Sequence, residues 1–234
     1  MIGTPVSRSP ASQRSPTRPP VVTGVARLLL LLRTATQYPL GRASARLGVH
    51  AEVADRAVGT CVRNDGGMTW KAPEVSREDF PLDLPERQAL EAFIRWHRQT
   101  LLWKVSGLTG EQLISRAVPT SNLTLLGIVR HLAQVERRWW RQRVAGDGVP
   151  DLYVEDEEWN ALEPDRAAED YQQLLDEWTA VDAVAARYDL DDTFQRRDET
   201  WSIRALYLHL IEEWARHNGH ADLIREAIDG ETGE

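Results

Sequence analysis

Four long segments of this chain repeat apolar residues at intervals of three and four, the spacing of one face of an α-helix. Pro85 precedes the first segment, and Ser202 and Gly230 flank the last as an expected N-cap and helix stop. No strand pattern exceeds a few residues. The sequence therefore predicts an all-α four-helix bundle in which residues 145–164 form one long connection. The predicted helices span about 86–105, 124–144, 165–188 and 202–229.

Composition changes near residue 68. Residues 1–67 contain nine Arg, no Lys and three acidic residues, whereas all nine Trp lie at or beyond Trp70. We expect residues 68–234 to form the bundle domain, because residues 1–67 have too little apolar area to fold alone. We interpret 1–67 as an upstream stretch translated in frame before a start at Met68, or as a disordered N-terminal extension. Its Arg- and Ser-rich, acid-poor character also resembles a transit peptide.

The charge and cysteine content exclude several classes of function. The net charge is −8, and the acidic residues are concentrated after residue 67. An acidic body argues against a nucleic-acid partner. The single cysteine, Cys61, precedes the body, so a metal there must use nitrogen and oxygen ligands. The longest apolar run, Leu28 to Leu32, is too short to span a membrane. We therefore expect a cytoplasmic protein with no membrane partner.

The last predicted helix carries the residues with the clearest chemistry. His209, Glu213 and His217 lie four residues apart, so they form one row along a helix beside an apolar stripe. Glu213 and His217 offer two metal ligands from one helical turn, and His131 on the second helix offers a third. Two His and one carboxylate leave coordination positions open, as in catalytic sites. Such ligands suit Zn, Ni, Fe or Mn. The alternative is a bundle whose histidines are structural and bind no metal.

Other polar residues near this row have supporting or structural roles in our interpretation. His209 and His220 are candidates for the shell around the ligands, and a core or interface role is the alternative for His209. His97 on the first helix is interpreted as a partly buried, hydrogen-bonded histidine. Glu136 is expected to be solvated or paired, and Arg130 is expected to form a surface salt bridge.

Residues 68–234 resemble the DinB/YfiT-like superfamily of metalloenzymes along nearly their whole length, and most closely its actinobacterial mycothiol S-transferase branch. The superfamily usually binds a metal through three His. Here Glu213 occupies the middle ligand position, as in the mycothiol-dependent maleylpyruvate isomerases, whose second domain this chain lacks. The resemblance implies His131, Glu213 and His217 as the metal ligands. It rests on Met68-Thr-Trp-Lys-Ala-Pro-Glu, Trp96-His-Arg, Gly107-Leu-Thr-Gly-Glu-Gln-Leu113, Leu126-Gly-Ile-Val-Arg-His-Leu and Glu212-Glu-Trp-Ala-Arg-His-Asn-Gly-His-Ala-Asp-Leu-Ile-Arg-Glu226.

The resemblance also implies a reaction. A divalent metal, zinc first among the candidates, would hold the sulfur of mycothiol as a thiolate that attacks a small electrophile. The expected function is therefore metal-dependent thiol S-transfer with mycothiol as co-substrate. The alternative is a non-catalytic metal-binding or stress-response protein on the same fold, since fold does not decide function. An exposed apolar helix face is compatible with a homodimer.

Overall fold

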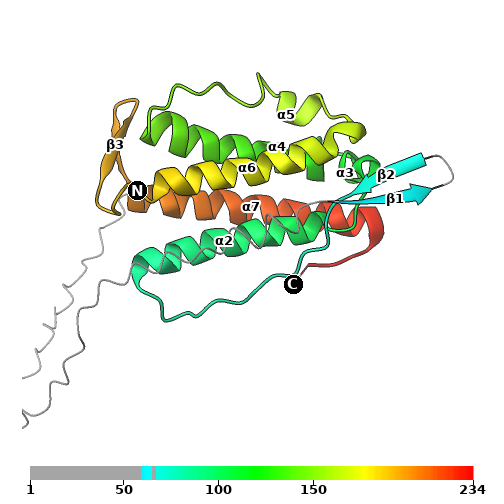
Figure 1. The fold of residues 1–234 in the computed structure, drawn as a ribbon, viewed down its shortest axis with the longest axis horizontal. Coiled ribbons are helices and arrows are strands. Elements are labelled where there is room, and N and C mark those ends of the chain that lie inside the picture. Colours follow the sequence, from blue (N-terminus) through cyan, green and yellow to red (C-terminus); the bar gives the residue numbers. More distant parts are fainter. Residues whose placement is uncertain (1–58, 65–66, 234) are drawn as a thin grey trace, which may run out of the picture. The chain divides into compact units, whose positions relative to one another are not determined.

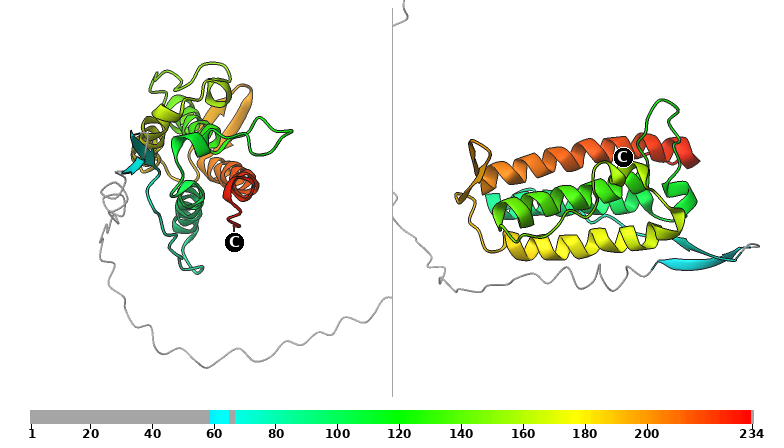
Figure 2. Two further views of the ribbon diagram at one scale, coloured as in Figure 1. Left: turned by 90° about the vertical axis from the view of Figure 1, so that its right-hand side faces the viewer. Right: turned by 90° about the horizontal axis from the view of Figure 1, so that it is seen from above.

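The computed structural model describes residues 59–64 and 67–233, and its centre is a bundle of four long helices (Figure 1, Figure 2). They are α2 (Glu86–Val105), α4 (Leu125–Glu136) with its continuation η1 (Arg137–Val144), α6 (Ala167–Ala185) and α7 (Ile203–Asp229). α2 and α7 run in one direction, and α4 and α6 run in the other (Figure 1). The connection 145–164 therefore returns along the bundle before α6 begins. This architecture confirms the predicted all-α four-helix bundle, whereas residues 1–58 lie outside the described part.

The ends of the long helices follow from local sequence. The Ser202 hydroxyl accepts a hydrogen bond from the Ala205 amide at 3.1 Å, and Gly230 takes a φ of +81° where α7 stops. These are the N-cap and left-handed C-terminal positions expected of a hydroxyl residue and a glycine. Thr109 forms a capping box with Gln112 at the start of the short helix α3 (Gly110–Leu113). Two further short helices, α5 (Glu157–Asn160) and η2 (Pro164–Arg166), lie in the long connection.

The second long helix departs from the uniform α-helix that its periodicity predicts. After Glu136 it continues as the π-helix η1, in which the Ala145 amide donates to the Trp140 carbonyl at 2.9 Å. Trp139 and Trp140 are neighbours in sequence, and both are buried here. The spacing of apolar residues in a sequence does not distinguish the π-helical hydrogen-bond pattern from the α-helical one. π-Helical turns are frequent at functional sites.

Two short antiparallel hairpins were not predicted. β1 (Thr60–Asn64) pairs with β2 (Gly67–Lys71), and β3 (Thr193–Arg196) pairs with β4 (Glu199–Ser202) at the end of the bundle between α6 and α7 (Figure 1). The first hairpin spans the boundary that we propose at Met68. Strands of four or five residues are too short to show a clear alternation, which explains why the sequence pattern misses them.

The four helices bury one apolar core between them. Trp214 of α7 is fully buried, and Leu101, Leu132, Leu174 and Leu210 contribute from all four long helices. No helix in the described part of the chain combines the length and hydrophobicity that crossing a membrane requires.

A buried ion-pair network crosses this core. Arg98 of α2 is 4% exposed; its Nε donates to Glu136 Oε1 at 2.9 Å, and its Nη1 donates to Asp182 Oδ1 at 2.9 Å. Trp214 Nε1 donates to Glu136 Oε1 at 2.8 Å. Burial opposes the charge of Arg98, but Asp182 and Glu136 outweigh it and raise the pKa of the guanidinium. Arg98 thus links α2 to α4 and α6, and Glu136 links α4 to α7.

Candidate metal centre

Two long helices bring His131, Glu213 and His217 together. Glu213 and His217 lie four residues apart on α7, so their side chains share one face of the helix. α4 supplies His131, whose ring centroid lies 4.7 Å from that of His217. One donor atom from each of the three residues lies within 4.8 Å of the others. The structure thus places at one point the three side chains that the sequence singles out.

The donor set fits a divalent metal ion. Two ligands at ~2.1 Å from one ion lie at most ~4.2 Å apart, so donors within 4.8 Å need only a small contraction. Burial lowers the pKa of His131, and burial together with His131 and His220 lowers the pKa of His217 to about 3. Both imidazoles are therefore neutral at pH 7, the form that binds metal. In the described part of the chain, neither buried Nδ1 atom has a hydrogen-bond partner.

Glu213 is the charged member of the centre and its most accessible carboxylate. Its Oε2 lies 3.7 Å from His217 Nε2, and its Oε1 lies 3.9 Å from His209 Nε2 and 3.5 Å from Arg216 Nη1. The Glu213 side chain is 17% exposed. A negative charge between two imidazoles, reachable from solvent on one side, suits a site that holds a cation and still admits a substrate.

The connection between α4 and α6 covers the centre, which the sequence did not predict. Trp159 of α5 lies against the centre, with its ring centroid 4.8 Å from that of His131 and 6.3 Å from that of His217. The carboxylate of Glu158, 8% exposed, lies 3.7 Å from His131 Nδ1. This distance is longer than a hydrogen bond. α5 therefore adds a buried acid and a large aromatic ring to the site.

Residues of α4 hold the connection in place. Gln134 Oε1 accepts from the Leu152 amide at 2.6 Å, and Arg130 Nη1 donates to the Ala161 carbonyl at 2.6 Å. Gly127 lets α5 approach closely, since a Cβ there would lie 2.9 Å from Trp159 Cε3. Arg130 is buried, so the expectation of a surface salt bridge at this residue is wrong. Its guanidinium instead fastens the segment that covers His131.

Replacing Glu158 with glutamine should weaken metal binding roughly 10–100-fold, because a carboxylate beside a ligating imidazole orients the ring and strengthens it as a donor. Glutamine keeps the size of the side chain and removes its charge. The measurement is metal affinity by competition with a chelator. Glu155→Gln, an exposed acid of the same connection, serves as the control and should leave the affinity unchanged. Equal affinities in the wild type and Glu158→Gln would show that Glu158 has no such role.

The other histidines that the structure describes divide into two groups. His209 lies beside Glu213, with its ring 4.6 Å from that of Trp139, and the His220 ring lies 5.2 Å from that of His217. Both therefore border the centre. His97 is held by Asn218, whose Nδ2 lies 3.3 Å from His97 Nδ1 and 3.0 Å from the His97 carbonyl. This contact matches its interpretation as a partly buried, hydrogen-bonded histidine.

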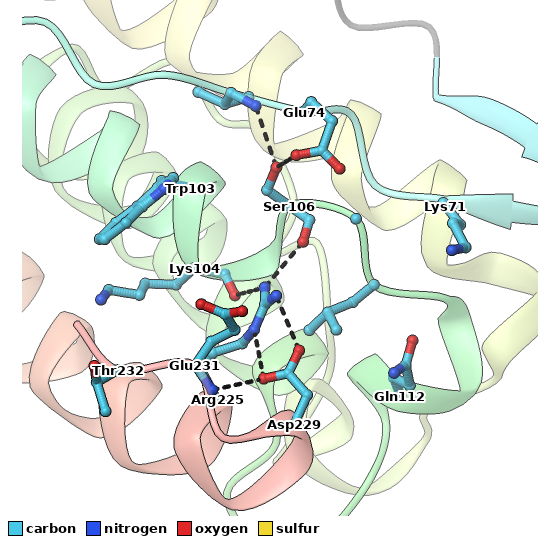
Figure 3. Close-up of a pocket in the computed structure, with 13 residues that line it drawn as sticks. Lys71, Glu74, Trp103, Lys104, Ser106, Gln112, Arg225, Asp229, Glu231 and Thr232 are labelled. Carbon is cyan, nitrogen blue, oxygen red and sulfur yellow. Dashed lines mark hydrogen bonds and ion pairs between the residues drawn. The ribbon is translucent and has the colours of Figure 1, made fainter.

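A separate cavity of about 380 Å³ lies where α2 and α7 end, and the three candidate ligands do not line it. Figure 3 shows Arg225 at its centre, bound to Asp229 and to the carbonyls of Lys104 and Ser106. Lys104 is paired with Asp222 at 2.5 Å. Arg225 and Lys104 are therefore already bound by neighbouring groups and hold the ends of α2 and α7 together, whereas Lys71 and Glu231 also line the cavity.

Comparison with known protein families finds a match over most of the chain. Residues 89–230, more than half of the chain, match the family described as Mycothiol-S-transferase. The matched region contains His131, Glu213 and His217 as well as the connection that covers them. Comparisons with curated proteins and with solved structures give no match.

Proposed function

Because this chain belongs to the mycothiol-S-transferase family, we propose that it is a metal-dependent enzyme that transfers the thiol mycothiol to small electrophiles. The observation that carries the proposal is the convergence of His131, Glu213 and His217 within the matched region. We propose these residues as the metal ligands, with zinc as the first candidate ion and Ni, Fe or Mn as the others. His209, His220 and Glu158 would surround them.

The residues of the site suit thiol activation. A divalent metal bound there would lower the pKa of a thiol and hold it as a thiolate. His131 and His217 supply neutral donors, and Glu213 supplies the negative charge that limits the net charge of the site. Trp159 and α5 shield one side from water, which strengthens the electrostatic interactions of the site. A thiolate held there would form the new sulfur–carbon bond as the leaving group departs with the electrons of its bond to that carbon, and the proton released from the thiol would pass to solvent.

The location and assembly of the protein remain predictions. We propose a cytoplasmic protein that acts on small molecules and binds neither nucleic acid nor membrane. Leu208 and Leu223 of α7 are large, exposed apolar residues, and a homodimer that covers this helix remains a prediction. Light scattering of the purified protein would decide the oligomeric state.

Thiol-dependent turnover tests the proposal directly. The metal-loaded protein is incubated with mycothiol and a generic chloronitroaromatic electrophile, and release of chloride or formation of the thioether is followed. The proposal predicts turnover that requires both thiol and metal. Stoichiometric metal binding without turnover would instead support the alternative of a non-catalytic metal-binding protein.

Replacing Glu213 with histidine should retain fold and metal but change the pH dependence of thiol transfer. Neutral imidazole in place of carboxylate adds one positive charge to the site, which lowers the pKa of a thiol held there. The thiolate also becomes a weaker nucleophile, because nucleophilicity falls with basicity. We therefore expect the rising limb of the rate profile to move to lower pH and the plateau to fall. Superimposable profiles at equal metal occupancy would argue that the sulfur does not react at this site.

A further inference from the structure

Beyond Glu213, the site continues into a group of basic and aromatic side chains. We call the side chains of Arg143, Arg196, Trp139 and Trp201 the arginine–tryptophan cluster. His209 connects the cluster to the metal centre: its Nε2 lies 3.9 Å from Glu213 Oε1, and its ring centroid lies 5.7 Å from that of Trp201. The cluster is therefore the next surface that a substrate held at Glu213 would reach.

Tryptophan rings position both arginines. Arg143 Cζ of η1 lies 4.4 Å from the centroid of Trp139, and Arg196 Cζ of β3 lies 5.1 Å from Trp139 and 5.7 Å from Trp201. Cation–π contacts of this kind restrain the guanidinium groups and leave N–H groups available to other partners. The Arg196 side chain is 28% exposed, so solvent reaches it.

The cluster carries more positive charge than the neighbouring carboxylates neutralise. Among the residues that the structure describes, Arg143 has no carboxylate within ion-pair distance, and Arg196 has only the exposed Glu199 at 3.7 Å. Burial lowers the pKa of Arg143, and the charges of Arg196 and Arg138 lower it further, whereas Asp151 opposes them. Two half-buried cations that repel each other cost free energy unless an anion joins them.

The position, stacking and charge of these residues point to a ligand chemistry. We propose, on the basis of the proposed function, that the arginine–tryptophan cluster binds a carboxylate or similar anionic group on the electrophile and so selects acidic electrophiles. Arginine N–H groups suit a carboxylate because they can donate two parallel hydrogen bonds to it. The half-buried Trp201 offers an aromatic surface to the unsaturated body of such a substrate.

A pair of matched electrophiles tests the inference. The electrophile 4-chloro-3,5-dinitrobenzoate differs from 1-chloro-2,6-dinitrobenzene only by a carboxylate. In both, the sulfur–carbon bond forms, and chloride leaves with the electrons of the carbon–chlorine bond. We expect the wild type to prefer the carboxylate probe at least roughly tenfold in kcat/KM, after correction for the uncatalysed rates. The double variant Arg143→Gln/Arg196→Gln should lose this preference.

Arg77→Gln is the matched control, because Arg77 also stacks on two tryptophans, Trp96 and Trp103, on the α2 side of the bundle. It should keep the preference. A preference that survives the double substitution, or none in the wild type, would overturn the inference. The comparison is then repeated with the thiol varied, using mercaptoacetate, which carries a carboxylate, and 2-mercaptoethanol, which does not. An arginine-dependent preference for mercaptoacetate would show that the cluster binds the thiol rather than the electrophile, and it would overturn the inference. If the double variant does not fold, the single variants Arg143→Gln and Arg143→Lys are compared instead. Only Arg143→Lys, which keeps the positive charge, should keep the preference for the carboxylate probe.

Calorimetric binding of the unreactive analogues 3,5-dinitrobenzoate and 1,3-dinitrobenzene separates this inference from the proposed function. Arginine-dependent binding of the benzoate without turnover of either electrophile would support the anion site and contradict thiol transfer. Turnover of both electrophiles with equal binding of both analogues would support thiol transfer and contradict the anion site.

Discussion

Replacing His217 with alanine should abolish tight metal binding and thiol transfer together. His217 faces both His131 and Glu213, so its loss leaves two donors, and two donors do not form a stable site for a divalent ion. Loss of a group that only supports a ligand costs roughly 10–100-fold in metal affinity, so loss of a ligand should exceed ~100-fold. We expect the fold to survive, because His217 lies beside the apolar core and makes no hydrogen bond within the described residues.

The measurement is metal affinity by competition with a chelator, together with thiol-dependent turnover. His97→Gln is the control, because His97 lies on α2 and contacts Asn218 rather than the centre. It should retain the metal. If His217→Ala bound metal with wild-type affinity and turned over electrophile, the ligand assignment would be wrong.

Replacing Arg98 with methionine should destabilise the fold by about 3–5 kcal/mol. The change leaves the fully buried Glu136 carboxylate without its cation, and burial already raises the pKa of this group. Glu136 was expected to be solvated or paired, and the structure shows the paired alternative, fully buried against Arg98. For a domain of this size the loss corresponds to roughly 6–20 °C in melting temperature.

Arg95→Met on the same helix is the control, and it should change stability by no more than about 0.5 kcal/mol. Removing the acid as well, in Arg98→Met/Glu136→Leu, should recover part of the loss, because the fully buried carboxylate at position 136 is then no longer left without its cation. A melting temperature of Arg98→Met equal to that of the wild type would show that the network contributes nothing.

The long helices could be predicted because each carries a strong local signal. Apolar residues at helical spacing marked all four, and Ser202 and Gly230 marked the ends of α7 within about a residue. The π-helical register of η1 and the two hairpins depend on hydrogen bonds that short segments do not encode in their periodicity. The proposed boundary at Met68 rests on composition alone.

The candidate ligands could be predicted for a similar reason, since Glu213 and His217 share a helix and His131 lies beside the buried stripe of α4. The position of the connection that covers the site could not be predicted from the sequence. Glu158 and Trp159 belong to an acidic segment without periodicity, and their position depends on contacts with Arg130, Gln134 and Gly127 of a distant helix. Only tertiary structure shows that Arg130 is buried.

Elemental analysis of the purified protein tests the central claim most directly. The wild-type protein and the triple variant His131→Ala/Glu213→Ala/His217→Ala are expressed in the same medium, purified without chelator and analysed for zinc, nickel, iron and manganese. We predict close to one equivalent of a single divalent metal in the wild type and almost none in the folded variant. Equal metal content in both proteins, or a wild type that binds no divalent metal even when supplied with it, would contradict the account.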